Sequence, residues 1–205
     1  MVLSYLTLRK LVGWLGILLP VILVIGVCLL GSHPALRGSI SAYYGTVMRG
    51  VFVGILFAIG VFLFSYRGYE RIDNIAGYAA CAFAIGVALF PSVSTDIWVE
   101  RVHFASAALL FLVLAYFSLY LFTKTGGNKT AMKRNRNKIY QACGVIILVC
   151  IALIPIYYWL FEDSSIAVIK PVFWLETFAL WAFGASWLIK GETLLKDRPT
   201  DTGPD

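Results

Sequence analysis

Glu176 and Arg49 are candidates for chemistry because each lies within or at the edge of a long apolar stretch. Glu176 stands about five residues into its stretch, roughly 8 Å along a helix that rises 1.5 Å per residue. A charge in a bilayer costs several kcal/mol unless it is paired or hydrated, so it marks a candidate site. Three arrangements stay open: an ion pair between the two residues, a ligand-binding or catalytic pair, and two separate solvated charges.

His103 belongs to a second candidate group. Asp96 precedes Glu100 by four residues, and Glu100 precedes His103 by three, which are spacings that bring side chains to one face of a helix. Two carboxylates and an imidazole suit a divalent ion such as zinc or a proton transfer. Asp96, Glu100 and His103 are therefore candidate metal ligands, and Asp96, His103 and Glu176 are candidate catalytic residues. The alternative is an interfacial histidine that only makes hydrogen bonds, and we expect no resident cofactor.

The segment 32–46 contains more Ser, Tyr and Gly than a plain connector needs. One interpretation is a lid that folds into the mouth of a helix bundle and completes a polar pocket. The other is an interfacial loop anchored by Tyr43 and Tyr44. If the lid forms, the predicted ligand-binding residues are Arg49, His103, Glu176, Ser39, Ser41 and Tyr44.

The elements that must position these residues are six apolar stretches of about twenty residues. The 205-residue chain is 60% hydrophobic and only 14% charged, with a mean hydropathy of +0.83, whereas soluble domains carry about 25% charged residues. About twenty helical residues cross a hydrocarbon core of about 30 Å. The sequence therefore predicts an all-α, polytopic transmembrane bundle in one domain (1–190). The predicted helices cover residues 11–31, 47–66, 75–92, 103–123, 139–160 and 171–190, and a flexible cytoplasmic tail follows at 191–205.

Positive charge sets the predicted orientation. Thirteen of the 17 Lys and Arg residues fall in alternate gaps between the apolar stretches, and basic loops stay in the cytoplasm. Both termini and the 123–138 loop are therefore expected inside. The thirteen are Arg9, Lys10, Arg67, Arg71, Lys124, Lys129, Lys133, Arg134, Arg136, Lys138, Lys190, Lys196 and Arg198; the other four are Arg37, Arg49, Arg101 and Lys170.

Small residues predict where helices touch, because helices in a bilayer associate through close packing. The candidates are Gly50-x-x-x-Gly54, Ala82-x-x-x-Gly86 and the run 184–186. Packing within the bundle is favoured, and a homo-oligomer seam is the alternative. In the turn before the third stretch, Asp73 or Asn74 is expected to cap the helix. Pro20 and Pro155 lie inside helical stretches and are expected to bend them.

The net charge of +6 does not indicate nucleic acid, because the basic residues border apolar spans. Contact with anionic lipid headgroups explains them better, so the expected partners are membrane lipids. Cys28, Cys81, Cys143 and Cys150 lie in apolar runs without metal-ligand spacing, and are expected to be packing residues.

Several segments together resemble an uncharacterised family of six-helix bacterial membrane proteins, and this resemblance implies a location in the bacterial inner membrane but no activity. The segments are 39–44, 48–54, 66–69, 73–77, 102–104 and 183–187. The chain is also remotely similar to the superfamily of alkaline ceramidases and adiponectin receptors, zinc proteins that hydrolyse lipid amides. Members of that superfamily carry a His four residues after a Ser and two further His residues in a late helix. In this chain Gly45 stands four residues after Ser41, and no late helix carries a His, so the three-histidine zinc site is lacking.

Three functions remain open. The first is a non-catalytic membrane protein whose outward-facing polar pocket binds a lipid or small amphiphile. The second is a membrane-embedded hydrolase, metal-dependent or acid/base, acting on a lipid. The third is a small transporter or channel, against which the two halves show neither broken half-helices nor a repeat. The first asks least of the residues and is the one we favour.

Overall fold

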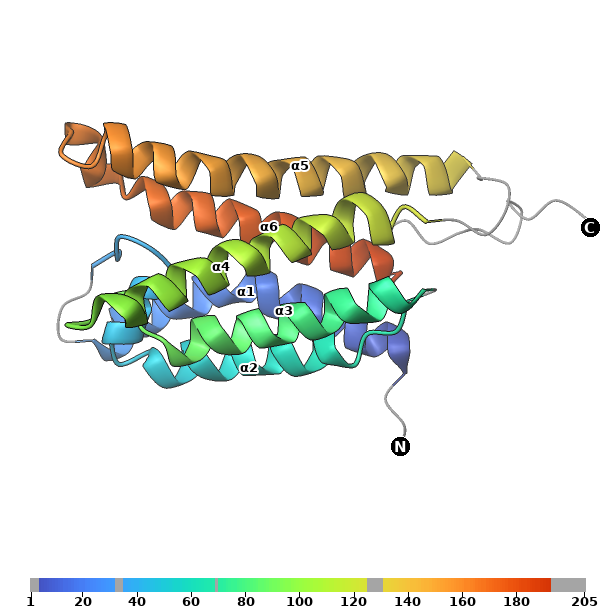
Figure 1. Ribbon diagram of the computed structural model, residues 1–205, viewed down its shortest axis with the longest axis horizontal. Coiled ribbons are helices and arrows are strands. Elements are labelled where there is room, and N and C mark those ends of the chain that lie inside the picture. The colour runs from blue at the N-terminus through green and yellow to red at the C-terminus, as the bar shows by residue number, and fades with distance from the viewer. Residues whose placement is uncertain (1–3, 32–34, 69, 125–130, 193–205) are drawn as a thin grey trace, which may run out of the picture.

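The computed structural model describes residues 4–31, 35–68, 70–124 and 131–192. Within these residues there is no strand, and the chain forms six α-helices (Figure 1). Their bounds are α1 (Tyr5–Leu30), α2 (Arg49–Phe64), α3 (Arg71–Leu89), α4 (Ile97–Tyr116), α5 (Ala131–Leu160) and α6 (Pro171–Lys190). Short 3-10 helices precede α2 (η1, Ser41–Gly45) and α6 (η3, Ser165–Ile169). A π-helical turn, η2 (Phe117–Leu121), continues α4.

The predicted all-α class and number of helices are confirmed, and α6 has the predicted bounds. The starts of α1, α3, α4 and α5 were predicted four to eight residues too late. The apolar stretch marks only the part suited to lipid, whereas polar residues extend each helix beyond it. Ser4 and Asp96 cap two of these extensions by accepting hydrogen bonds from the amides of Thr7 and Trp98. Both Pro20 and Pro155 lie inside continuous helices.

Five helices are long and apolar enough to cross a membrane: α1, α3, α4 with its π-turn, α5 and α6. The exception is α2, whose 16 residues span about 24 Å at 1.5 Å per residue. It lies beside α3 along the bundle (Figure 1). Large apolar side chains face outward from the bundle, including Leu29, Val61 and Trp159, as suits a surface covered by lipid.

The helices pack in a closed ring in which each contacts the next and α6 returns to α1. Most of α6 is buried, because it lies between α1 and α5 and also touches α4. The start of α1 and the end of α6 lie at one end of the bundle, whereas the connections after α1, α3 and α5 lie at the other (Figure 1). This arrangement fits a chain that crosses the membrane an even number of times. Residues 193–205 of the predicted tail lie outside the described residues.

Two of the predicted small-residue contacts occur inside the bundle and one does not. Gly184 of α6 packs directly on the backbone of Gly13 in α1, and Gly86 packs on Ser106 of α4. Nothing lies within 4 Å of the place where a Cβ would stand on Gly50 or Gly54. The expectation that the Gly50 and Gly54 motif packs within the bundle is therefore wrong, because this face of α2 points outward.

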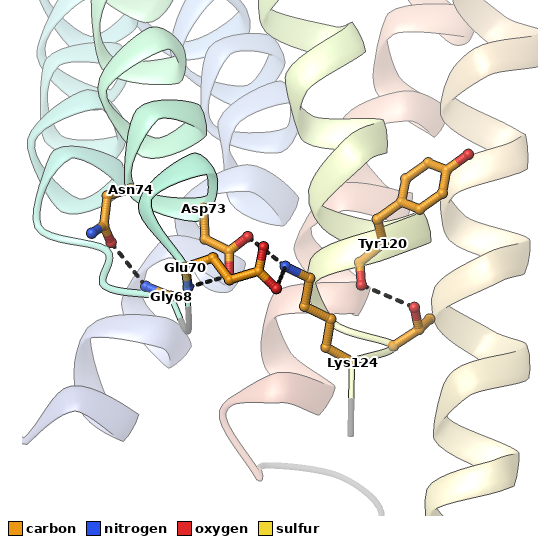
Figure 2. Close-up of polar contacts among 7 residues, drawn as sticks. Gly68, Glu70, Asp73, Asn74, Tyr120 and Lys124 are labelled. Carbon is orange, nitrogen blue, oxygen red and sulfur yellow. Dashed lines mark hydrogen bonds and ion pairs between the residues drawn. The ribbon is translucent and has the colours of Figure 1, made fainter. Parts of the chain in front are cut away.

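The turn between α2 and α3 is joined to the end of α4 by an ion pair. Lys124 Nζ lies 2.8 Å from Asp73 Oδ1 and 3.3 Å from Glu70 Oε1 (Figure 2). The Asp73 side chain is 1% exposed and that of Lys124 is 29% exposed. The N-cap of α3 is Glu70, so the prediction of Asp73 or Asn74 as the cap is wrong. Asp73 lies in the first turn of α3 and forms a capping box with Glu70. The side chain of Asn74 instead accepts from the Gly68 amide at 3.1 Å.

We expect Lys124→Met to lower the midpoint of thermal unfolding in detergent at pH 7. The hydrogen bond with Asp73 raises the pKa of Lys124, so the stabilisation is complete at neutral pH and is lost as the pH rises through the strongly alkaline range. The single variant leaves the buried Asp73 carboxylate without this cation. Asp73→Asn in the Lys124→Met background should therefore restore part of the loss. The exposed Lys138→Met is the control, and a Lys124→Met midpoint equal to that of the control would contradict the prediction.

Candidate functional site

A cavity of about 750 Å³ opens near the end of the bundle where α1 joins α2. Its volume lies within the roughly 300–1,000 Å³ typical of small-molecule sites. Its walls come from α4 and α5. The helix α6 contributes Pro171, Val172 and Glu176, and the segment 38–42 closes one end. The lining residues on α4 and α5 are Phe104, Ala107, Ala108, Phe111, Ile151, Ile154, Pro155, Tyr157 and Tyr158, and those on connections include Gly38, Ser39, Ser41, Ala42, Ser92, Val93, Glu162, Ala167 and Lys170.

Glu176 is the acidic side chain that α6 contributes to this cavity. Its Oε2 accepts a hydrogen bond from the Ile40 amide at 2.5 Å, and one turn earlier the Phe173 amide donates to Gly38 O at 3.0 Å. These two bonds hold the segment 38–41 across the beginning of α6. Ile40 and Ser41 are buried, so this part of the connection packs into the bundle as the lid interpretation expects.

The two serines of this segment line the cavity together with Glu176. Ser39 Oγ accepts from the Ala42 amide at 3.0 Å, which stabilises the η1 turn. Tyr43, next in the turn, is completely buried against Phe173, and burial raises the pKa of its hydroxyl. The segment 39–43 thus places the hydroxyl groups of Ser39 and Ser41 in the lining of the cavity, and Tyr43 packs against Phe173 of α6.

The apolar part of the cavity is shaped by small and helix-breaking residues. Ala107 and Ala108 leave space on α4, and Pro155 lies opposite on α5. A proline has no amide to donate to the carbonyl four residues earlier, so the Ile151 carbonyl loses its usual helical donor. Both Ile151 and Pro155 line the cavity.

Arg49 does not pair with Glu176, so of the three arrangements that the sequence left open, the ion pair does not occur. Its Nη2 donates to Tyr44 Oη at 2.6 Å, and Tyr44 Oη in turn lies 3.4 Å from Leu89 O. The reason is that η1 turns Tyr44 back toward α2, where it reaches the arginine first. Arg49 and Tyr44 belong to the α2 and α3 side of the bundle, and neither lines the cavity.

The predicted group of Asp96, Glu100 and His103 does not converge either. His103 is 1% exposed and its Nδ1 lies 2.7 Å from Phe90 O. Asp96 caps α4, and Glu100 Oε1 accepts from the Ser94 amide at 2.7 Å. All three side chains are thus used by nearby backbone groups. Among residues 4–31, 35–68, 70–124 and 131–192, no group of three or more His, Cys, Asp or Glu is placed to hold a metal ion.

Sequence reasoning missed several lining residues that are now evident. Tyr157 and Tyr158 were not singled out, and Lys170 was counted only among the four basic residues outside the basic connections, although all three line the cavity. Lys170 adopts a left-handed conformation, with φ 55°, immediately before Pro171 starts α6. The available signal was Pro155 inside an apolar stretch, because a proline inside a helix bends it.

The chain matches no family model, no curated protein and no solved structure. The site must therefore be interpreted from its own geometry.

Proposed function

We propose that this protein is a multi-pass membrane protein that binds a lipid or small amphiphile, without catalysis, in the cavity between α4, α5 and α6. The observation that carries the proposal is the polarity of that cavity. Glu176 and the connections contribute its polar side chains, among them Ser39, Ser41, Ser92, Glu162 and Lys170, whereas the α4 and α5 walls consist of alanine, isoleucine, phenylalanine, proline and tyrosine side chains. An amphiphile has the same division, with a polar head and an apolar tail.

The head group we infer is one that donates hydrogen bonds, such as a hydroxyl or an amine. A carboxyl group accepts hydrogen bonds at several positions, and the Ile40 amide occupies one of those on Glu176. The tail would follow the α4 and α5 walls, past Ala108 and Ile154, toward the middle of the bundle. We place the cavity in the extracytoplasmic leaflet of a bacterial inner membrane, because the basic connections lie at the other end.

Hydrolysis and transport have less support. Glu176 and His103 lie apart, and no histidine lines the cavity, while Ser39 is engaged by the Ala42 amide. Of the candidate catalytic residues Asp96, His103 and Glu176, only Glu176 lines the cavity, so the acid/base or metal set of the hydrolase hypothesis is not assembled there. No contact among the described residues favours a transport path.

The test is saturable binding of two radiolabelled probes, monoolein and oleylamine, to purified protein in detergent. We expect Glu176→Ala to weaken both about tenfold or more, because a hydrogen bond to a charged group contributes about 1.5–3 kcal/mol. Glu176→Gln keeps an acceptor but loses the charge, so it should weaken oleylamine more than monoolein. Val61→Gln, on the lipid-facing surface of α2, should change neither. Absence of saturable binding to the wild-type protein, or equal loss in the Val61 variant, would refute the proposal.

A further inference from the structure

We propose that the amphiphile cavity selects a zwitterionic phospholipid, whose head group carries both a phosphate and a primary ammonium. The inference rests on the proposed function, since it names the head group that the same cavity binds. It is carried by the charged side chains of the lining and by the two tyrosines at the end of α5.

Charged side chains of both signs line the cavity. Glu162 and Lys170 come from the connection between α5 and α6, and Glu176 comes from α6 itself. In the part of the chain that the structure describes, no ion pair joins Lys170 to either glutamate. A neutral head group would supply no opposite charge to Lys170 or to Glu162. A head group with both charges is complementary to this lining.

The acidic side of the lining suits a primary ammonium. The Tyr158 hydroxyl lies within electrostatic reach of both Glu176 and Glu162, so the two carboxyl groups gather near one ring. Tyr157 also lines the cavity, and its ring centre lies 5.5 Å from that of Tyr158. A carboxyl group accepts hydrogen bonds from an ammonium, and the face of an aromatic ring attracts a cation within about 6 Å of its centre. These four side chains therefore offer both kinds of contact.

Lys170 is the cation that we assign to the phosphate. Its side chain is half-buried and lines the cavity. Its backbone has φ 55° and ψ 60°, a left-handed conformation that residues with a Cβ rarely adopt. Hydrogen bonds of its backbone with Ala167 and Trp174 hold it there. Such unfavourable conformations cluster at ligand sites, and a lysine ammonium is a common partner of phosphate oxygens.

The test compares four probes that share an oleoyl or oleyl chain and differ in the charges of the head group. Oleoyl lysophosphatidylethanolamine carries both charges, oleoyl lysophosphatidylglycerol carries the phosphate, oleylamine carries the ammonium, and monoolein carries neither. Each competes with radiolabelled monoolein for purified protein in a neutral detergent. We expect the wild type to bind lysophosphatidylethanolamine about tenfold or more tightly than each of the other three.

Variants of the lining should remove one half of this preference at a time. Lys170→Asn removes the cation, and asparagine tolerates the left-handed backbone, so the protein should fold. It is expected to reduce the preference for lysophosphatidylethanolamine over oleylamine about tenfold, and Lys170→Arg should keep that preference. Glu162→Gln should reduce the preference over lysophosphatidylglycerol instead. The matched controls are Asp163→Asn and Arg101→Gln, at exposed residues that do not line the cavity, and both preferences should survive in them.

Two results would overturn this inference while the proposed function stands, because an amphiphile would still bind. One is a wild-type affinity for lysophosphatidylethanolamine no higher than that for monoolein, oleylamine or lysophosphatidylglycerol. The other is an equal loss of preference in the Asp163 and Arg101 variants, which would show that the charge of the whole end of the bundle selects the ligand. If none of the four probes binds saturably to the wild type, the proposed function itself fails.

Discussion

Gly184→Val is expected to give a protein that no longer unfolds cooperatively and elutes as aggregate in size-exclusion chromatography. A Cβ on Gly184 would stand 2.6 Å from the Gly13 carbonyl oxygen and 2.6 Å from Ile17 Cγ1. Atoms do not approach so closely, and the first neighbour is backbone that cannot rotate away. The α1 and α6 helices would have to separate, and overpacking of a core costs about 1–3 kcal/mol or more.

The matched control for this variant is Gly54→Val on α2, where a Cβ meets nothing within 4 Å. It should elute and unfold as the wild type does. A change in oligomeric state of Gly54→Val, without loss of folding, would support the homo-oligomer seam that the sequence left open. If Gly184→Val unfolds at the wild-type temperature, the close packing of α1 on α6 is wrong.

Ala108→Trp is expected to abolish amphiphile binding while the protein stays folded. Ala108 lies on the cavity wall of α4, and an indole placed there would fill space that the tail needs. We expect the apparent affinity for monoolein to fall at least tenfold, because a tail that cannot enter loses about 0.8 kcal/mol for each methylene left unburied. The thermal midpoint should hold or rise, since the new side chain fills an empty volume.

The control for the blocked cavity is Val61→Trp, which adds the same side chain to the lipid-facing surface of α2. It should bind monoolein as the wild type does. Unchanged binding by Ala108→Trp would show that the probe occupies another surface, and the proposed function would then have to be abandoned.

The fold was largely predictable because the bilayer requires long apolar helices. Hydropathy located all six helices, and α6 agrees with its predicted range because Pro171 begins it and Lys190 ends it. Helix starts were less predictable, since capping depends on polar contacts such as those of Ser4 and Asp96. The shortness of α2 was not predicted, because Val47 and Met48 before it and Tyr66 after it extend the apolar stretch beyond the helix.

The site was predictable only in part. Glu176, Ser39 and Ser41 were identified from their types and do share a cavity. Arg49 was assigned to the same group on depth alone, but depth does not say which helices are neighbours around the ring. Tyr44 binds Arg49, and this contact depends on the η1 turn, for which the sequence gives no periodic signal. The side of the membrane remains a prediction from charge.

The most direct test of the central claim is to map where an amphiphile touches the protein. Monoacylglycerol with a photoreactive diazirine in its tail would be crosslinked to the protein in lipid nanodiscs, and labelled peptides would be identified by mass spectrometry. We predict labelling of residues 104–111 and 151–158 that unlabelled monoolein suppresses and that Ala108→Trp abolishes. Labelling spread evenly over the outer faces of the helices, with no suppression by monoolein, would contradict the claim.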